Sequence, residues 1–133
     1  MDRLFLDANV LFSAAYRPNA GLLSLWKLNA AALCSSRYAL EEARFNLTEE
    51  SQRQRLARLS TSLELFDAAP EETAPPVHLP AKDLPILQSA IAAGATHLLT
   101  GDVRHFGQFF GKRIEGVLVL LPGEYLKQFS GGR

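Results

Sequence analysis

Short apolar runs along the chain alternate with longer stretches in which apolar side chains recur every three or four positions. The runs at residues 4–6, 32–35, 97–100 and 117–121 have the length and composition of buried strands, and residues 63–66 form a weaker fifth candidate. The longer stretches have the spacing of amphipathic helices. The pattern therefore predicts strands and helices that alternate along one chain.

The predicted helices begin and end at residues with clear capping chemistry. They cover about residues 9–16, 20–28, 38–47, 48–63, 83–93 and 122–129. Ser36 is expected to cap the third, Thr48 to open the fourth and Asp83 to cap the fifth, which Gly94 closes. Four prolines within residues 68–80 predict a connector there.

Strands that alternate with helices indicate an α/β domain. The sheet is expected to be mostly parallel, with helices on both of its faces, and residues 1–133 are expected to form a single domain. Right-handed crossovers place the carboxyl ends of parallel strands along one edge of the sheet, where open α/β sheets bind their ligands.

Four acidic residues are predicted to meet at this edge. Asp7 follows the first strand, and Asp102 follows the strand at residues 97–100. Asp83 begins the helix that leads into that strand, so it starts at the same edge. Glu42 lies about one turn into the helix after the second strand. Four separate segments would thus direct carboxylates to one place.

Each of these residues also has a simple structural explanation. Asp7 and Asp83 are good helix caps, Asp102 suits a turn, and Glu42 could be a solvated helix residue. Glu41 competes with Glu42, because successive helix residues point about 100° apart and only one can face the site. We expect Glu42 to be that residue.

Clustered carboxylates need a cation or bound protons. Two unit charges about 4 Å apart repel by roughly 4 kcal/mol at an effective dielectric constant of about 20. Oxygen ligands suit Mg²⁺ or Mn²⁺, which activate a water and stabilise developing charge in phosphodiester chemistry. Asp7, Asp83 and Asp102 are the expected ligands, and Asn9 and Thr100 are expected to support them by hydrogen bonds.

The overall charge counts against binding nucleic acid by bulk electrostatics. Fourteen basic residues balance fourteen acidic ones, whereas domains that bind in this way are usually basic. An enzyme that uses metal ions and a few local cations remains compatible with this balance. Arg17, Arg104, His105 and Lys112 are the expected substrate contacts, although His105 could instead pack locally beside Phe106.

The remaining composition predicts a cytoplasmic protein. Cys34 is the only cysteine and is expected to be a buried thiol. No apolar run approaches the ~18 residues of a membrane span. The N-terminus leads directly into a predicted strand, so no signal peptide is expected.

Several of these segments resemble a PIN domain. The similarity lies in Leu-Asp-Ala-Asn-Val-Leu at residues 6–11, Leu-Glu-Glu-Ala at 40–43, Lys-Asp-Leu-Pro-Ile-Leu at 82–87, and Leu-Leu-Thr-Gly-Asp-Val-Arg-His-Phe at 98–106. It spans about residues 3–126. The last segment is similar to a prokaryotic subgroup related to the toxins of VapBC toxin–antitoxin pairs.

The resemblance implies a Rossmann-like three-layer α/β/α sandwich and a Mg²⁺- or Mn²⁺-dependent endoribonuclease. By position, Asp7, Glu42, Asp83 and Asp102 match the acidic quartet of the family. Toxins of this kind usually form homodimers and are held by a small antitoxin. Many members carry a further acid two or three residues after the last Asp, where this chain has Arg104 and His105. One tightly bound ion is therefore expected rather than two.

Two other classes of protein share some of these features. The neutral charge and the missing acid would also fit a PIN-like protein that binds RNA or a partner with little turnover. A response-regulator receiver domain shares the size and the acidic strand ends. It needs a phospho-accepting Asp at the end of a central strand, and this chain has no Asp between residues 8 and 66.

Overall fold

A single mixed sheet organises the fold. The structure is a computed structural model, which describes residues 1–67 and 84–131. Its six-stranded sheet has the order β3-β2-β1-β4-β6-β5, and β5 alone pairs antiparallel. The strands are β1 (Asp2–Leu6), β2 (Ala31–Ser36), β3 (Glu64–Phe66), β4 (His97–Leu99), β5 (Arg113–Ile114) and β6 (Val117–Leu120). The predicted, mostly parallel α/β sheet is confirmed.

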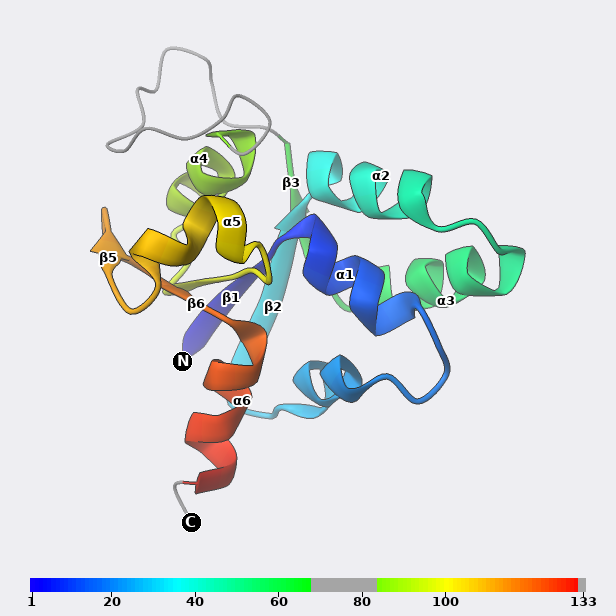
Figure 1. Ribbon diagram of the computed structural model, residues 1–133, viewed down its shortest axis with the longest axis horizontal. Helices are drawn as coiled ribbons and strands as arrows, with labels where there is room; N and C mark the ends of the chain where they lie inside the picture. Colours follow the sequence, from blue (N-terminus) through cyan, green and yellow to red (C-terminus); the bar gives the residue numbers. More distant parts are fainter. Residues whose placement is uncertain (68–83, 132–133) are drawn as a thin grey trace.

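Helices cover both faces of the sheet, with α1, α2 and α3 on one side and α4 on the other (Figure 1). The helices are α1 (Ala8–Ala15), α2 (Arg37–Asn46), α3 (Glu50–Ser60), α4 (Leu84–Ala92), α5 (Val103–Phe106) and α6 (Pro122–Gly131), with two 3₁₀ segments, η1 (Gly21–Lys27) and η2 (Gly107–Phe109). In the described parts of the chain, no helix has the length and apolar character to span a membrane.

The direction of the strand order reverses between β1 and β4. The chain moves outward from β1 through β2 to β3, then returns to the other side of β1 for β4 and β6. Leu6 pairs with Leu99, and the Asp7 amide extends this ladder by donating to the Leu99 carbonyl at 3.1 Å. Ligand sites in open α/β sheets form where such a reversal occurs, and the residues that follow Leu6 and Leu99 lie there.

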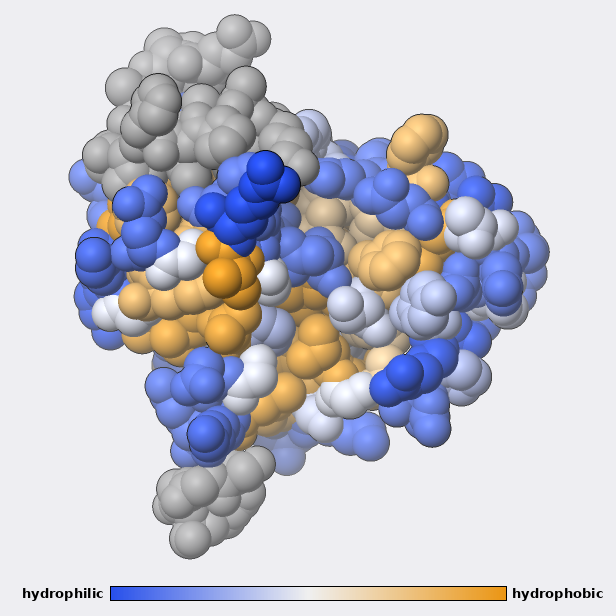
Figure 2. Space-filling view, viewed as in Figure 1, coloured by the Kyte–Doolittle hydropathy of each residue, from blue (hydrophilic) through white to orange (hydrophobic). Residues whose placement is uncertain are grey.

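The core forms around β1, which is covered on both faces. Leu4, Phe5 and Leu6 are each 0% exposed, as expected for a central parallel strand that reads as a continuous apolar run. Phe106 and Tyr125 add buried rings from the C-terminal part of the chain. Figure 2 shows that hydrophobic side chains also reach the surface between α6 and the region of α1 and η1.

Most of the predicted helix limits are confirmed. Ser36 caps α2 by accepting from the Ala39 amide at 3.0 Å. Gly94, with a φ of 68°, follows the last turn of α4, where a left-handed residue ends many helices. The predicted role of Asp83 as a cap and the predicted connector at residues 68–80 lie outside the described residues.

The structure corrects two expectations and adds short elements that were not predicted. The helix expected from residue 20 is the tighter 3₁₀ segment η1. The helix expected to open at Thr48 has Glu49 as its N-cap, and the Glu49 amide donates to the Gln52 side chain at 3.1 Å. The short elements α5, η2 and β5 were not predicted, whereas β6 matches the strand expected at residues 117–121.

Candidate functional site

Three of the four predicted acidic residues line one cleft. The cleft has a volume of about 390 Å³ and lies at the carboxyl ends of β1 and β4. Asp7, Glu42 and Asp102 contribute to its wall. The other lining residues are Ala8, Asn9, Phe12, Asn46 and Gly101. Asp83 lies outside the described residues, so its part in the site stays a prediction.

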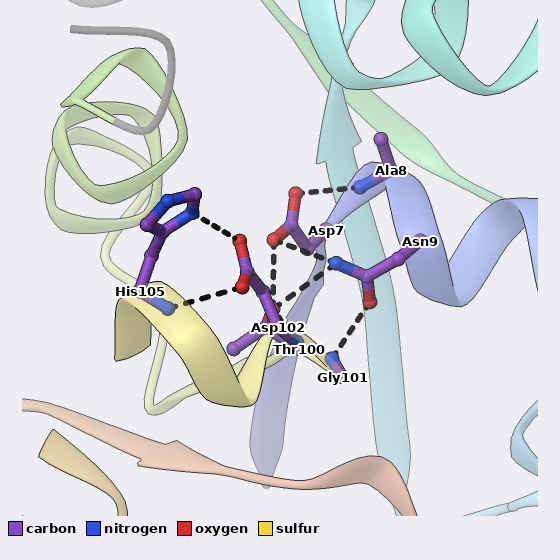
Figure 3. A network of polar contacts seen from close by, with 7 residues as sticks. All are labelled: Asp7, Ala8, Asn9, Thr100, Gly101, Asp102 and His105. Carbon is purple, nitrogen blue, oxygen red and sulfur yellow. Dashed lines mark hydrogen bonds and ion pairs between the residues drawn. The ribbon is translucent and has the colours of Figure 1, made fainter. Parts of the chain in front are cut away.

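Asp7 is held by hydrogen-bond donors on both of its carboxylate oxygens (Figure 3). It is the N-cap of α1, and its Oδ1 accepts from the Ala8 amide at 2.7 Å. Its Oδ2 accepts from the Thr100 hydroxyl at 2.8 Å and from Asn9 Nδ2 at 3.2 Å. Asp7 is only 4% exposed. These donors stabilise a negative charge in a buried place and fix the orientation of the carboxylate.

Thr100 links Asp7 to the segment that carries Asp102. The Thr100 side chain is 0% exposed, and besides donating to Asp7 its Oγ1 accepts from the Asp102 amide at 3.1 Å. Asn9 makes a second link, because its Oδ1 accepts from the Gly101 amide at 2.7 Å. A Cβ at Gly101 would lie 3.3 Å from this oxygen, so a larger residue there would crowd Asn9.

Asp102 is oriented by His105. Asp102 caps the short helix α5, and its Oδ1 accepts from the His105 amide at 3.1 Å. Its Oδ2 lies 2.9 Å from His105 Nδ1. His105 was expected either to contact substrate or to pack locally, and the structure places its ring against the Asp102 carboxylate (Figure 3).

A further part of the cleft wall comes from α2, which packs against α1. Glu42 lines the cleft, whereas Glu41 does not. Both line a separate hollow on the outer side of α2 with Phe45. The geometry therefore distinguishes the two glutamates, and only Glu42 reaches the space near Asp7.

The predicted substrate cations are dispersed. Arg17 lines a neighbouring groove that shares Phe12 with the cleft. Arg104 and Lys112 are exposed and are not part of the cleft wall.

The cleft wall fits a hard cation held by few protein ligands. Among the residues that the structure describes, no group of three or more His, Cys, Asp and Glu side chains is close enough to hold a metal ion. Mg²⁺ is usually bound through one or two carboxylates, keeps several waters and takes phosphate oxygens from the substrate. Asp7 and Asp102, which share the cleft and present only oxygens, match that mode.

The sequence did not single out two residues of the cleft wall, Phe12 and Asn46. Asn46 lies four positions after Glu42, and Phe12 four positions after Ala8, so each lies one helical turn along the same face. This spacing was the available signal. Phe12 also lies three positions after Asn9, so both residues follow a predicted site residue, Asn9 or Glu42, by one helical turn.

Comparison with known proteins identifies the class of the protein. The chain matches the family model of the PIN domain over residues 3–104 and belongs to this family. Its fold is similar to that of a chain in the crystal structure of VapBC2 from Rickettsia felis bound to a DNA fragment from their promoter. That match has 18% sequence identity and a TM-score of 0.64, and covers 88% of this chain and 96% of the other. No curated protein sequence matches.

Proposed function

We propose that the protein is a Mg²⁺- or Mn²⁺-dependent endoribonuclease whose acidic site consists of Asp7, Glu42, Asp83 and Asp102. The observation that carries this proposal is the cleft at the strand-order reversal, where Asp7 is fixed by three donors beside Asp102. Membership of the PIN family supports it, because PIN domains are generally nucleases.

The residues of the site have distinct roles in this proposal. Asp7 and Asp102, together with Asp83, would hold the cation, which would supply stabilisation of the negative charge that develops on the phosphate and a lowered pKa of a bound water. Asn9 and Thr100 keep Asp7 from rotating. These contacts support a site that is oriented before substrate arrives.

Glu42 and three basic side chains are proposed to act on the substrate. Glu42, which lines the cleft, accepts a proton from the attacking water. Arg17, Arg104 and Lys112 neutralise phosphates of the bound strand. The proposed substrate is single-stranded RNA.

We extend the proposal to the biological role of a toxin that a small antitoxin restrains and that forms a homodimer. The support is the fold shared with a chain of VapBC2. Induced expression should stop bacterial growth with the wild type and not with Asp102→Asn. Sedimentation equilibrium measures the mass of the isolated protein, and a monomer would refute the homodimer.

The decisive experiment is cleavage of labelled RNA and of single-stranded DNA with Mn²⁺, with Mg²⁺ or with EDTA. The wild type should cut RNA only when a metal ion is present. Asp102→Asn should reduce the rate about 1,000-fold or more. Asp2→Asn is the matched control, because Asp2 lies in β1 at the other end of the sheet.

Two outcomes would contradict the proposal. Cleavage that survives Asp102→Asn points to another site or to a contaminating nuclease. RNA binding without any cleavage favours the alternative, a PIN-like protein that binds RNA or a partner with little or no turnover.

A further inference from the structure

An apolar groove adjoins the acidic cleft. Its volume is about 680 Å³, and it lies between α1, the segment leading into η1, and α6. Figure 2 shows hydrophobic side chains at the surface in this region. Phe12 lines both the groove and the cleft. A ligand bound in the groove would therefore lie beside the acidic site.

Two aromatic rings form part of the groove wall. The Phe12 and Tyr16 ring centroids are 5.5 Å apart, with an angle of 36° between the planes. Tyr16 is 53% exposed, so much of its ring is open to a ligand. Exposed aromatic faces of this kind bind nucleobases by stacking.

The charge of the groove suits an anion. None of its described lining residues is Asp or Glu, and Arg17 lies on its wall. Arg17 is exposed and forms no ion pair with any other described residue. The neighbouring cleft is acidic and would repel a phosphate in the absence of a cation. The groove thus offers a phosphate group a cation and no carboxylate directly beside the cleft.

The segment that carries Tyr16 and Arg17 is held in place by α3. Gln52 Nε2 donates to the Tyr16 carbonyl at 3.1 Å, and Arg55 donates to the Ala15 carbonyl at 2.6 Å. Both bonds satisfy carbonyls at the end of α1 that lack helical partners. Because the backbone of the segment is anchored, it needs little ordering when a ligand binds.

We propose that this groove binds the nucleoside next to the scissile phosphate of single-stranded RNA. The base stacks on Phe12 and Tyr16, and Arg17 contacts the flanking phosphate. The volume lies within the range of roughly 300–1,000 Å³ typical of small-ligand sites, which suits one nucleoside. The inference rests on the proposed function, since it names how the same site holds its substrate.

The test measures binding rather than cleavage. Fluorescence anisotropy of a short labelled single-stranded RNA is recorded with EDTA in an Asp102→Asn background. Adding Tyr16→Ala should weaken binding roughly tenfold, whereas Tyr16→Phe should bind like the parent because it keeps the ring. Arg17→Ala should weaken binding and reduce its salt dependence, because a phosphate contact is lost.

Matched controls and a modified RNA locate the effect. Phe45→Ala removes an aromatic residue that is 84% exposed on α2, and Arg58→Ala removes an exposed cation on α3. Neither residue lines the groove, so both variants should bind like the parent. A set of RNAs, each lacking one base at a different position, is then compared. For the parent protein, loss of the base at one position should weaken binding. For Tyr16→Ala, loss of that base should cause no further weakening.

The outcomes separate this inference from the proposed nuclease activity. If the wild type cuts RNA with metal but Tyr16→Ala binds like the parent, the nucleoside site is refuted and the activity stands. That result would also be expected if the groove holds a protein partner. If the Tyr16 and abasic effects appear but the wild type never cuts, the nucleoside site stands and the nuclease proposal fails.

Discussion

Each end of the β1–β4 pair carries an aspartate and a threonine but, in the part of the chain that the structure describes, only the carboxyl end forms a cleft. At the amino ends, Asp2 Oδ2 accepts from the Tyr125 hydroxyl at 2.7 Å, and the Thr96 hydroxyl accepts from the Arg3 amide at 2.8 Å. The ring of His97 packs edge-on against Tyr125. The polar groups at this end are therefore paired within the fold. The contacts of Tyr125 with Asp2 and His97 hold α6 against the sheet.

At the carboxyl ends, the donors approach from one side and leave a cleft open on the other. Asp7 accepts from Ala8, Asn9 and Thr100, yet it still lines the cleft beside Asp102. The difference follows from topology. The strand order reverses between β1 and β4, so successive connections diverge at this end. A similar set of residues thus stabilises the fold at one end and supplies a candidate site at the other.

The largest expected effect comes from exchanging a carboxylate for an amide at each end. Asp7→Asn should reduce RNA cleavage about 1,000-fold or more, whereas Asp2→Asn should leave it unchanged. Wild type and Asp2→Asn should also gain thermal stability when Mn²⁺ is added, because the ion binds only the folded site. Asp7→Asn should lose that gain. An equal rise in melting temperature for all three proteins would show that the metal binds elsewhere.

A smaller effect distinguishes the two neighbouring glutamates. Glu42→Gln should reduce the rate of cleavage on the order of 100-fold if Glu42 accepts a proton, because only Glu42 lines the cleft. Glu41→Gln is the matched control and should cut RNA like the wild type. The reverse ranking would mean that α2 presents Glu41 to the substrate.

Removing one hydroxyl at each end should separate activity from stability. Thr100→Val loses the bond to Asp7 and should lower cleavage roughly 10- to 100-fold. Tyr125→Phe loses the bond to Asp2 and should lower the free energy of unfolding by about 1 kcal/mol without changing cleavage. Urea unfolding and initial cleavage rates measure the two quantities. A comparable loss of activity in Tyr125→Phe would refute the division between the two ends.

The sequence predicts features that depend on neighbouring residues. The apolar run before Asp7 gives β1, Ser36 gives the start of α2 and Gly94 gives the end of α4, because strand burial and helix caps act locally. The placement of Asp7 and Asp102 at one edge required only the rule for parallel strands. The PIN fold was therefore predictable from the pattern and the motifs.

The features that were missed depend on weak turn signals or on distant partners. The β5–β6 hairpin turns at Glu115 and Gly116, whose φ angles are 51° and 88°. Glu is uncommon in such a turn, where Asn or Asp usually precedes Gly. The bond between Asp2 and Tyr125 joins residues 123 positions apart, which no local pattern encodes. The bond from His105 to Asp102 needed the short helix α5, which is too brief to show a periodicity.

The smallest expected effect is a pH dependence of stability that arises at the amino end. Burial lowers the pKa of His97 from its ordinary value of 6.5, Asp2 opposes the shift, and Arg113 adds to it. As pH falls below 6.5, the unfolded chain takes up a proton at His97 that the folded protein resists. The unfolded state then binds more protons, so the free energy of unfolding must fall with falling pH.

His97→Phe removes this titration and keeps a ring against Tyr125. Urea unfolding at about pH 7.5 and about pH 5.5 brackets the range in which His titrates. The wild type should lose more stability between the two values than His97→Phe, and the other histidines cancel because both proteins contain them. An equal loss would show that His97 takes up its proton in the folded protein as readily as in the unfolded chain. The amino end would then be less tightly closed than the contacts of Asp2 and Tyr125 imply.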